Sequence, residues 1–365
     1  MNTEERTYWV AWASVPGIGP ARTRALLRVF GSLQTAWGQP FATLRAAGLN
    51  ERTTMRAVAA FKERDPATEW ERLVKHDVTV LTEEDNQYPQ RLRHTVGAPA
   101  LFFMRGTLTP ADEVAIAIVG TRRMTGYGRE VAHRLATGLG GAGVTVVSGL
   151  AKGIDGIAHK AALDAGGRTL AVLAHGLDMI YPYEHKGLAA RITAEGGALI
   201  SEYPPGTKPD ATNFPARNRI ISALALGVVV VEADIKSGAM ITANIAAEQG
   251  RDVFAVPGSV LNPMSAGCHA LLRDGARLVA DVSDILSELQ LGTHHLPQLV
   301  QQEFPELPGV PGADVVLRAL STEPQHIDDL CRESGIIMSD LGGILVQLML
   351  TGMVRTAGPQ LYVRM

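Results

Sequence analysis

Between residues 86 and 290 the sequence repeats one pattern, in which a short apolar and often β-branched run precedes a stretch with helical spacing. The seven runs of strand length lie at 114–119, 144–147, 169–173, 198–200, 228–231, 253–256 and 278–279. Strands that are apolar on both faces and alternate with helices predict a parallel sheet covered on both sides. We therefore expect an α/β protein with an extended Rossmann-like, doubly wound parallel sheet, whose site lies at the carboxyl ends of its strands.

The length of 365 residues predicts two or three domains, because one hydrophobic core rarely spans so long a chain. Composition and helical spacing divide the chain into four segments. They are an all-α, SAM-like helix-hairpin-helix domain at 1–85, the Rossmann-like domain at 86–290, a proline-rich linker at 291–312 and a winged-helix domain at 313–365.

The winged-helix prediction comes from three helical stretches followed by a terminal hairpin. The third helix, at 339–350, contains no Lys or Arg, and residues 291–365 hold 4 basic and 8 acidic residues. Because contacts to phosphate need cations, we expect this domain to bind protein rather than duplex DNA.

The stretch Val15-Pro16-Gly17-Ile18-Gly19-Pro20 separates two predicted helices and resembles the turn of a helix-hairpin-helix motif. Glycines in such a turn let backbone N–H groups approach a phosphate. The helix that follows carries Arg22, Arg24 and Arg28. Two interpretations stay open, namely that this domain contacts DNA or that the turn is only a packing corner.

Cysteine usage and hydropathy exclude several classes of protein. The two cysteines, Cys268 and Cys331, are too few for a disulfide framework or a Cys₄ zinc site, so we expect no metal and a reducing compartment. The longest apolar run, at 224–231, is far shorter than the ~18 residues of a membrane helix. We therefore expect a cytoplasmic protein without a membrane partner.

The loop after the first predicted strand does not fit a nucleotide cofactor. It reads Gly120-Thr121-Arg122-Arg123, whereas a dinucleotide site would need G-x-G-x-x-G there. The two arginine side chains would block the close approach of a dinucleotide to the backbone. The sequence contains no Walker A motif either, so we expect no cofactor.

The loops that follow the predicted strands combine cations with aromatic rings. The cations are Arg122, Arg123, Lys152, Lys208, Arg217 and Arg219, and the rings are Tyr127, Tyr181, Tyr183, Tyr203 and Phe214. A basic groove with stacking faces is typical of proteins that bind single-stranded nucleic acid. Phe214 is the strongest candidate because one ring and two guanidiniums lie within six residues there. Tyr181 and Tyr203 each precede a proline, and for them the alternative to stacking is that they brace their loops.

Seven ordered blocks of the central segment closely resemble the DNA-processing protein A family (DprA, also called Smf). The blocks are GTRRMTGYGRE, SGLAKGIDGIAHKAAL, GLDMIYP, LISEYPPGTKP, FPARNRIISAL, VVVEADIKSGAMITANIAAEQGRDVFAVPGS and SAGCHALLRDGA. The resemblance implies an extended Rossmann fold that binds single-stranded DNA without sequence preference. It also implies a homodimer that loads the recombinase RecA onto single-stranded DNA in recombination and natural transformation, and it implies binding rather than catalysis.

The resemblance also assigns residues to the DNA-binding groove. The family's Gly-Ser/Thr-Arg element falls on Gly120, Thr121 and Arg122, its Phe-x-x-Arg-Asn element falls on Phe214, Arg217 and Asn218, and Lys208 resembles a phosphate contact. Lys152 and Arg219 complete the predicted set because they lie in the same loops. His175 and His269 depart from the residues usual in the family, which cautions against assuming a shared small-molecule site.

An enzyme is the alternative, because related Rossmann-like folds include nucleotide phosphoribohydrolases. Asp178, Glu202 and Glu232 at strand ends could act as acid or base on an N-glycosidic bond. Those enzymes carry a Pro-Gly-Gly loop followed by a glutamate, whereas no acid follows Pro257-Gly258-Ser259-Val260. We therefore expect no catalytic residue, and we expect Glu232 to pair with Arg217 or Arg219.

Overall fold

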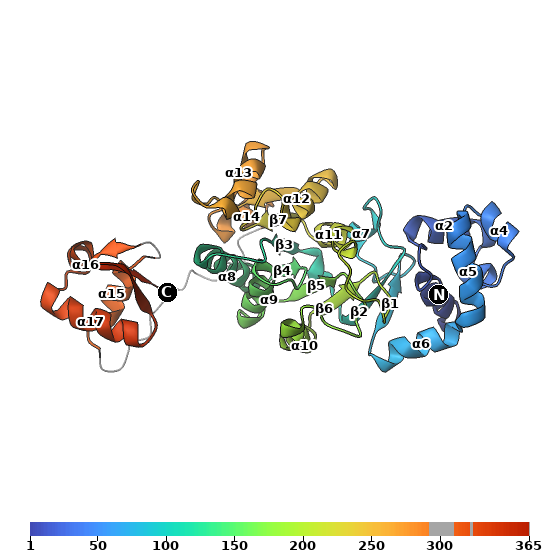
Figure 1. The fold of residues 1–365 in the computed structure, drawn as a ribbon, viewed down its shortest axis with the longest axis horizontal. Coiled ribbons are helices and arrows are strands. Elements are labelled where there is room, and N and C mark those ends of the chain that lie inside the picture. Colours follow the sequence, from blue (N-terminus) through green and yellow to red (C-terminus); the bar gives the residue numbers. More distant parts are fainter. Residues whose placement is uncertain (292–309, 322–323, 365) are drawn as a thin grey trace. The chain divides into compact units, whose positions relative to one another are not determined.

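A nine-stranded sheet with the order β1-β2-β6-β5-β4-β3-β7-β8-β9 forms the centre of the first of two units of the chain (Figure 1). Its strands are β1 (Thr79–Thr82), β2 (Leu101–Gly106), β3 (Ala115–Val119), β4 (Thr145–Ser148), β5 (Thr169–Leu173), β6 (Ala198–Ser201), β7 (Gly227–Val230), β8 (Asp252–Ala255) and β9 (Arg277–Leu278). The structure, a computed structural model, describes residues 1–291, 310–321 and 324–364, and the two units cover residues 1–296 and 297–365. The linker predicted at 291–312 lies almost wholly outside the described residues.

The seven strands from β3 to β9 pair in parallel with their neighbours, which confirms the predicted doubly wound α/β fold. From β3 the chain builds β4, β5 and β6 on one side, then returns to place β7, β8 and β9 on the other. The strand order therefore reverses between β3 and β7. In open parallel sheets, the crevice at the carboxyl ends of the strands at such a reversal is the usual ligand site.

Strands β1 and β2 extend the sheet in a way that the sequence analysis missed. β2 pairs antiparallel with β6, and β1 pairs antiparallel with β2. β1 lies within residues 1–85, for which the sequence analysis predicted only short helices. Three of its four residues are β-branched, but the run directly follows a series of short helices and precedes the alternating pattern of the central segment.

Helices cover both faces of the parallel sheet. On one face lie α8 (Gly126–Gly141), α9 (Ile154–Asp164) and α14 (Val282–Glu288), and on the other lie α11 (Asn213–Leu224), α12 (Gly238–Glu248) and α13 (Ala266–Arg273). Successive side chains of a strand point to opposite faces, so Ile116 packs with α8 and α9 whereas Ala117 packs with α11 and α12. Both residues are fully buried, which explains why the strands read as continuous apolar runs.

Six helices precede the sheet and pack against its β1–β2 end. They are α1 (Thr3–Ala13), α2 (Pro20–Phe30), α3 (Leu33–Ala36), α4 (Phe41–Ala46), α5 (Glu51–Glu63) and α6 (Pro66–Lys75). Trp9 and Trp12 of α1 share one buried cluster with Leu101 and Phe103 of β2. The predicted hairpin turn joins α1 to α2. Of two further short helices, α10 (Lys186–Ala194) shares the buried cluster of α1, whereas α7 (Gln90–Arg93) packs with α11.

The second unit has the predicted winged-helix order. Its elements are α15 (Ala313–Ala319), β10 (Gln325–His326), α16 (Ile327–Ser334), α17 (Met338–Leu350), β11 (Val354–Gly358) and β12 (Leu361–Arg364). The strands pair in the order β10-β12-β11, and Leu341, Leu345 and Leu348 of α17 pack into the core against Leu330. In the described parts of the chain no single helix could span a membrane, although the pair α16 and α17, bent by 106°, reaches that length and apolarity together.

Candidate nucleic-acid interface

The loop after β3 lies at the point where the strand order reverses. The Thr121 N–H donates to the carbonyl oxygen of Glu232, which follows β7, at 2.7 Å. A side chain at Gly120 could not fit, because its Cβ would lie 2.6 Å from Cγ1 of Ile154 at the start of α9. Gly153 has φ +82°, and a Cβ there would lie 2.3 Å from the carbonyl oxygen of Thr121. The two glycines let the β3 loop pack directly on the start of α9, and the exposed Arg122 side chain projects from this junction.

Phe214 forms the centre of an aromatic and cationic cluster at this edge of the sheet. It lies in the first turn of α11 and is half-buried. The Arg122 guanidinium lies over its ring at 5.3 Å, and the Tyr181 ring, 47% exposed, lies 6.2 Å away at a tilt of 54°. An aromatic face beside an exposed guanidinium suits both a nucleic-acid base and its phosphate.

Arg217 lies beneath Phe214, and its side chain is not at the surface. Only 5% of the residue is exposed, and its guanidinium lies 5.9 Å from the Phe214 ring centre. Its Nη1 group donates to the carbonyl oxygens of Gly149, at 2.9 Å, and of Val172. The phosphate contact predicted for Arg217 therefore does not match its position, because the charged group is enclosed and engaged by backbone carbonyls.

The buried charge of Arg217 faces a buried carboxylate on α9. Burial lowers the pKa of the Arg217 guanidinium to about 10. Burial also raises the pKa of the Asp155 carboxyl, and the positive charge of Arg217 and two backbone hydrogen bonds oppose that rise. Those bonds come from the N–H groups of Gly149, at 3.1 Å, and Ala151, at 3.4 Å. Arg217 and Asp155 together hold both sides of the loop after β4.

Leu150, in the same loop, adopts a left-handed backbone conformation with φ +54°. Such a conformation costs a residue with a side chain about 1–2 kcal/mol. Two histidines stabilise it, since the Leu150 N–H donates to Nε2 of His159 at 3.3 Å and Nδ1 of His185 donates to the Leu150 carbonyl oxygen at 2.9 Å. Nδ1 of His159 donates in turn to the Thr169 hydroxyl at 2.6 Å. The His159 ring must be neutral for this arrangement, because Nε2 accepts a hydrogen bond.

Acid should therefore destabilise the protein through His159. Burial lowers the pKa of its imidazole to about 3 from the ordinary value of 6.5, so the unfolded chain takes up this proton first as the pH falls. The free energy of unfolding should therefore decrease as the pH falls from 6.5 towards 3. This group contributes up to about 1.4 kcal/mol of that decrease per pH unit. Urea unfolding as a function of pH measures this slope. His159→Gln should flatten the profile, and parallel profiles for the two proteins would contradict the assignment.

The other predicted residues differ in how accessible they are. Lys208 is exposed, and Lys152 is exposed and forms an ion pair with Glu184. Asn218 is 8% exposed, and its amide accepts from Nε of Arg217 at 3.2 Å. Arg219 is held by both carboxylate oxygens of Glu202 at 2.7 Å and by the carbonyl oxygen of Gly97. The predicted residues whose side chains reach the surface are thus Arg122, Lys152, Lys208 and, in part, Phe214, and of these Lys152 is already paired with Glu184.

The predicted pairing of Glu232 with Arg217 or Arg219 is wrong. The Glu232 carboxylate accepts from the N–H and hydroxyl of Thr125, at 2.9 and 2.6 Å, and from the side-chain amide of Asn262 at 3.3 Å. Thr125 is the N-cap residue of α8, and its hydroxyl accepts from the Gly128 N–H, so neutral donors of the N-cap residue and of Asn262 provide what an arginine was expected to provide. Gly128 is necessary there, because a Cβ would lie 2.1 Å from Oε2 of Glu232.

The carboxylates of the alternative enzyme are likewise engaged by protein groups. Glu202 holds Arg219, Glu232 accepts from Thr125, and Oδ1 of Asp178 accepts from the Gly206 N–H at 2.9 Å. His175 is buried after β5, with Nδ1 3.0 Å from the Gly176 carbonyl oxygen. Within the residues that the structure describes, no three His, Cys, Asp or Glu side chains are grouped to hold a metal ion.

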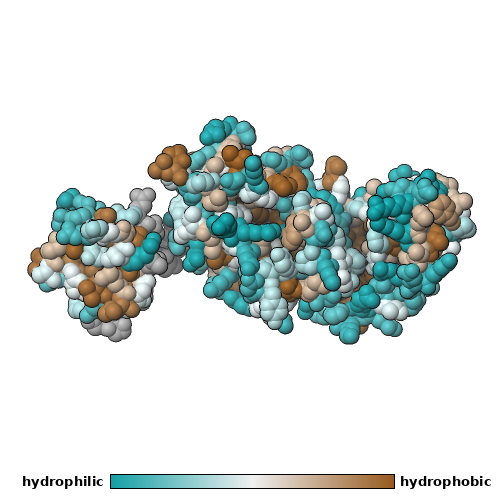
Figure 2. Space-filling model, viewed as in Figure 1, coloured by the Kyte–Doolittle hydropathy of each residue, from teal (hydrophilic) through white to brown (hydrophobic). Residues whose placement is uncertain are grey.

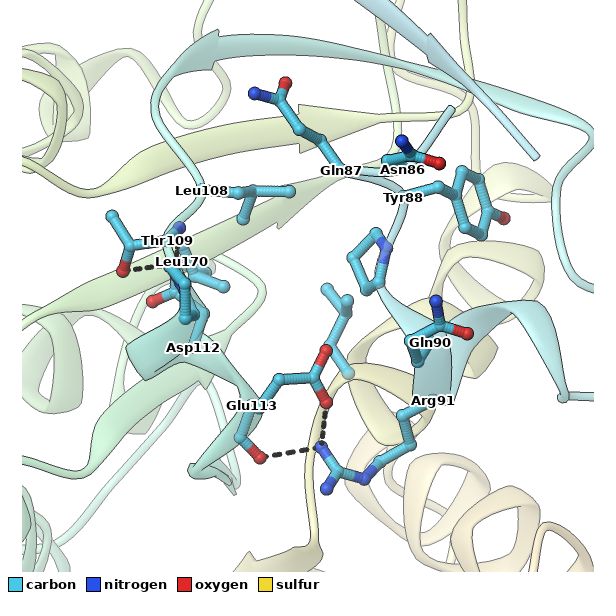
Figure 3. A pocket seen from close by; sticks show the side chains of 13 residues that line it. Asn86, Gln87, Tyr88, Gln90, Arg91, Leu108, Thr109, Asp112, Glu113 and Leu170 are labelled. Carbon is cyan, nitrogen blue, oxygen red and sulfur yellow. Dashed lines mark hydrogen bonds and ion pairs between the residues drawn. The ribbon is translucent and has the colours of Figure 1, made fainter. Parts of the chain in front are cut away.

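A cavity of about 410 Å³ lies away from this crevice (Figure 3). Leu170 at the start of β5 and Leu224 at the end of α11 contribute to its lining, so it opens near the amino ends of the parallel strands. Its charged groups are paired, since Arg91 donates to both the carbonyl oxygen and the carboxylate of Glu113. The cavity thus lacks the free cations that distinguish the crevice.

Fold and crevice together define a Rossmann-like protein with an added winged helix, whose site presents cations and an aromatic ring instead of a nucleotide-binding loop. The chain belongs to the DNA recombination-mediator protein A family, which residues 79–290 match. Residues 301–358 match the winged-helix domain of DprA. The β1 strand that the sequence analysis missed begins at the same residue as the family match.

Individual relatives agree with this assignment. Protein Smf of Escherichia coli is 42% identical over 282 residues, which are 76% of this chain and 75% of the relative. The crystal structure of DNA processing protein A from Streptococcus pneumoniae is similar with a TM-score of 0.66 and 35% identity, covering 77% of this chain and 97% of that one. The Helicobacter pylori protein, solved for its single-stranded DNA binding mode, is similar with a TM-score of 0.53 and 30% identity, covering 59% and 96%.

Proposed function

We propose that the chain binds single-stranded DNA without sequence preference, through the crevice at the carboxyl ends of β3, β4 and β5. The observation that carries this proposal is the half-buried Phe214 ring, whose centre lies 5.3 Å from the exposed Arg122 guanidinium and 6.2 Å from the Tyr181 ring. Such a site stacks bases of any identity and contacts phosphates, neither of which reads sequence. The single-stranded DNA binding mode of the Helicobacter pylori relative supports the same role.

Arg122 provides the direct test. Arg122→Ala should weaken binding to single strands of all sequences alike, by about fivefold at 0.1 M salt, and lower the slope of log affinity against log salt by about 0.7. Fluorescence anisotropy over a salt series measures both quantities, with a duplex of the same length as the comparison. A parent protein that does not bind the single strand would contradict the crevice, and an unchanged slope would contradict the role of Arg122.

Two further proposals concern the partners of the protein. The protein acts as a dimeric mediator that delivers the strand to a RecA-type recombinase in recombination and natural transformation, with no catalytic step. Exposed apolar side chains support self-association, since Val260 and Leu261, in the loop between β8 and α13, are 86% and 89% exposed, and brown surface lies beside α13 in Figure 2. Light scattering that finds a monomer, or strand exchange by the recombinase that the protein does not stimulate, would argue against these proposals.

The winged-helix unit is proposed to bind protein. Along α17 the exposed side chains Met338, Val346 and Leu350 are apolar, and α17 carries no Lys or Arg. A helix without cations would make weak contacts to a phosphate backbone. If the full chain binds duplex DNA tightly and the chain without this unit does not, the proposal is contradicted.

A further inference from the structure

Two arginines from different helices converge on the turn between α1 and α2. Arg22 of α2 donates from Nη1 to the carbonyl oxygen of Gly17. Arg56 of α5 donates from Nη1 to the neighbouring carbonyl oxygen of Pro16 at 3.3 Å. Each guanidinium makes one hydrogen bond to the turn, which leaves its other N–H groups for a ligand.

Arg52 adds a third cation beside this pair. It is exposed and lies one helical turn before Arg56 on α5, at a spacing that places both side chains on one face. Like charges at this spacing destabilise a helix. Within the described residues no carboxylate lies within 4.0 Å of the guanidinium of Arg22, Arg52 or Arg56, so their mutual repulsion is not offset by an ion pair. We call these three residues the hairpin patch.

Arg24 shows what a structural arginine looks like in the same helix. Its guanidinium donates to both carboxylate oxygens of Glu83 and to the carbonyl oxygen of Ala98, at 2.8 to 3.2 Å. It therefore ties α2 to the sheet, although the sequence analysis grouped it with Arg22 as a possible DNA contact. The contrast separates one arginine that stabilises the fold from three whose charges remain unmatched.

The surface around the hairpin patch suits a polyanion whose bases are not available for stacking. The turn itself, from Val15 to Pro20, consists of aliphatic, glycine and proline residues, and nothing lies within 4 Å of where a Cβ of Gly19 would be. A backbone can approach such a surface closely, but the turn offers no ring on which a base could stack. The stacking face of the molecule lies instead in the crevice around Phe214.

We propose that the hairpin patch of Arg22, Arg52 and Arg56 binds the phosphate backbone of double-stranded DNA. This deepens the proposed function, in that the crevice takes the single strand and the helices before the sheet take a duplex. The contacts are to phosphate only, so they carry no sequence preference.

Full-length protein with Arg52→Gln tests the proposal, because Arg52 makes no hydrogen bond to the turn and its loss should not disturb the fold. Affinity for a blunt duplex should fall about eightfold at 0.1 M salt, and the salt slope should fall by about 0.9, the value for one phosphate contact on B-form DNA. Affinity and slope for a single strand of the same length should not change. Lys62→Gln is the matched control, since Lys62 lies exposed in the last turn of the same helix and should leave both probes unaffected.

Three outcomes would overturn the proposal. One is a parent protein that does not bind the blunt duplex, and another is a triple variant, Arg22→Gln with Arg52→Gln and Arg56→Gln, that binds duplex like the parent. The third is displacement of the duplex by millimolar inorganic phosphate at constant ionic strength, which would show a site for a small free anion. Loss of single-strand binding by the parent would contradict the proposed function instead, and the duplex measurement would still report on the patch.

Discussion

Arg217→Ala is expected to lower the free energy of unfolding by about 3–5 kcal/mol, the cost of removing one partner from a buried charge pair. The change leaves the Asp155 carboxylate buried without its compensating charge. It also removes the donors to the carbonyl oxygens of Gly149 and Val172. Urea unfolding of the two proteins measures the difference.

A double-mutant cycle distinguishes this explanation from simple loss of packing. If the charge of Asp155 matters, then Asp155→Asn should recover part of the stability lost by Arg217→Ala, so that the two changes are not additive. Arg122→Ala is the control from the same site, because its exposed side chain should leave the unfolding free energy within about 0.5 kcal/mol. An Arg217→Ala protein that keeps its stability and loses only its affinity for DNA would show that Arg217 contacts the ligand after all.

Phe214→Ala should weaken binding to single-stranded DNA by about 1–3 kcal/mol, the range for one stacked base. The salt slope should stay close to that of the parent, because the change removes a ring and no charge. Anisotropy titrations at several salt concentrations measure both. Phe214→Trp should keep the affinity, since it retains a stacking face.

The position of Arg122 makes the salt slope informative in that experiment. Its guanidinium lies 5.3 Å from the centre of the Phe214 ring, so the ring also supports the cation. A slope that falls in Phe214→Ala would mean that Arg122 has moved away from its phosphate, and the stacking explanation would then fail.

Much of the fold could be predicted from the sequence because a parallel sheet leaves a local signal. Strands β3 to β7 are buried apolar runs between helical stretches, and their pairing follows from the fold class, whereas β9 is only the exposed pair Arg277–Leu278. β1 and β2 are apolar runs too, but only the four-residue helix α7 lies between them, so they fall outside the alternation of strands with long helices. β2 pairs antiparallel with β6, almost a hundred residues further along the chain, and pairing at that distance is decided by tertiary packing.

The sequence predicted which residues form the candidate site, but not which of their side chains are buried. Phe214 and Arg217 are three residues apart in the sequence, which correctly places them on one side of α11. Which of them faces solvent depends on how α11 packs over the ends of β4 and β5, and no local pattern encodes that. The same holds for Asp155 and His159, which lie in an ordinary helical stretch of the sequence and prove to be buried supports of the Leu150 loop.

The loop at Leu150 has a consequence for the thermodynamics of binding. Its backbone is fixed by Arg217, Asp155, His159 and His185 before any ligand arrives. The conformational entropy of this part of the crevice is therefore lost when the chain folds and not when DNA binds. The loop backbone should then move by less than about 1 Å on binding, and most of the ordering cost of the complex should fall on the flexible DNA strand.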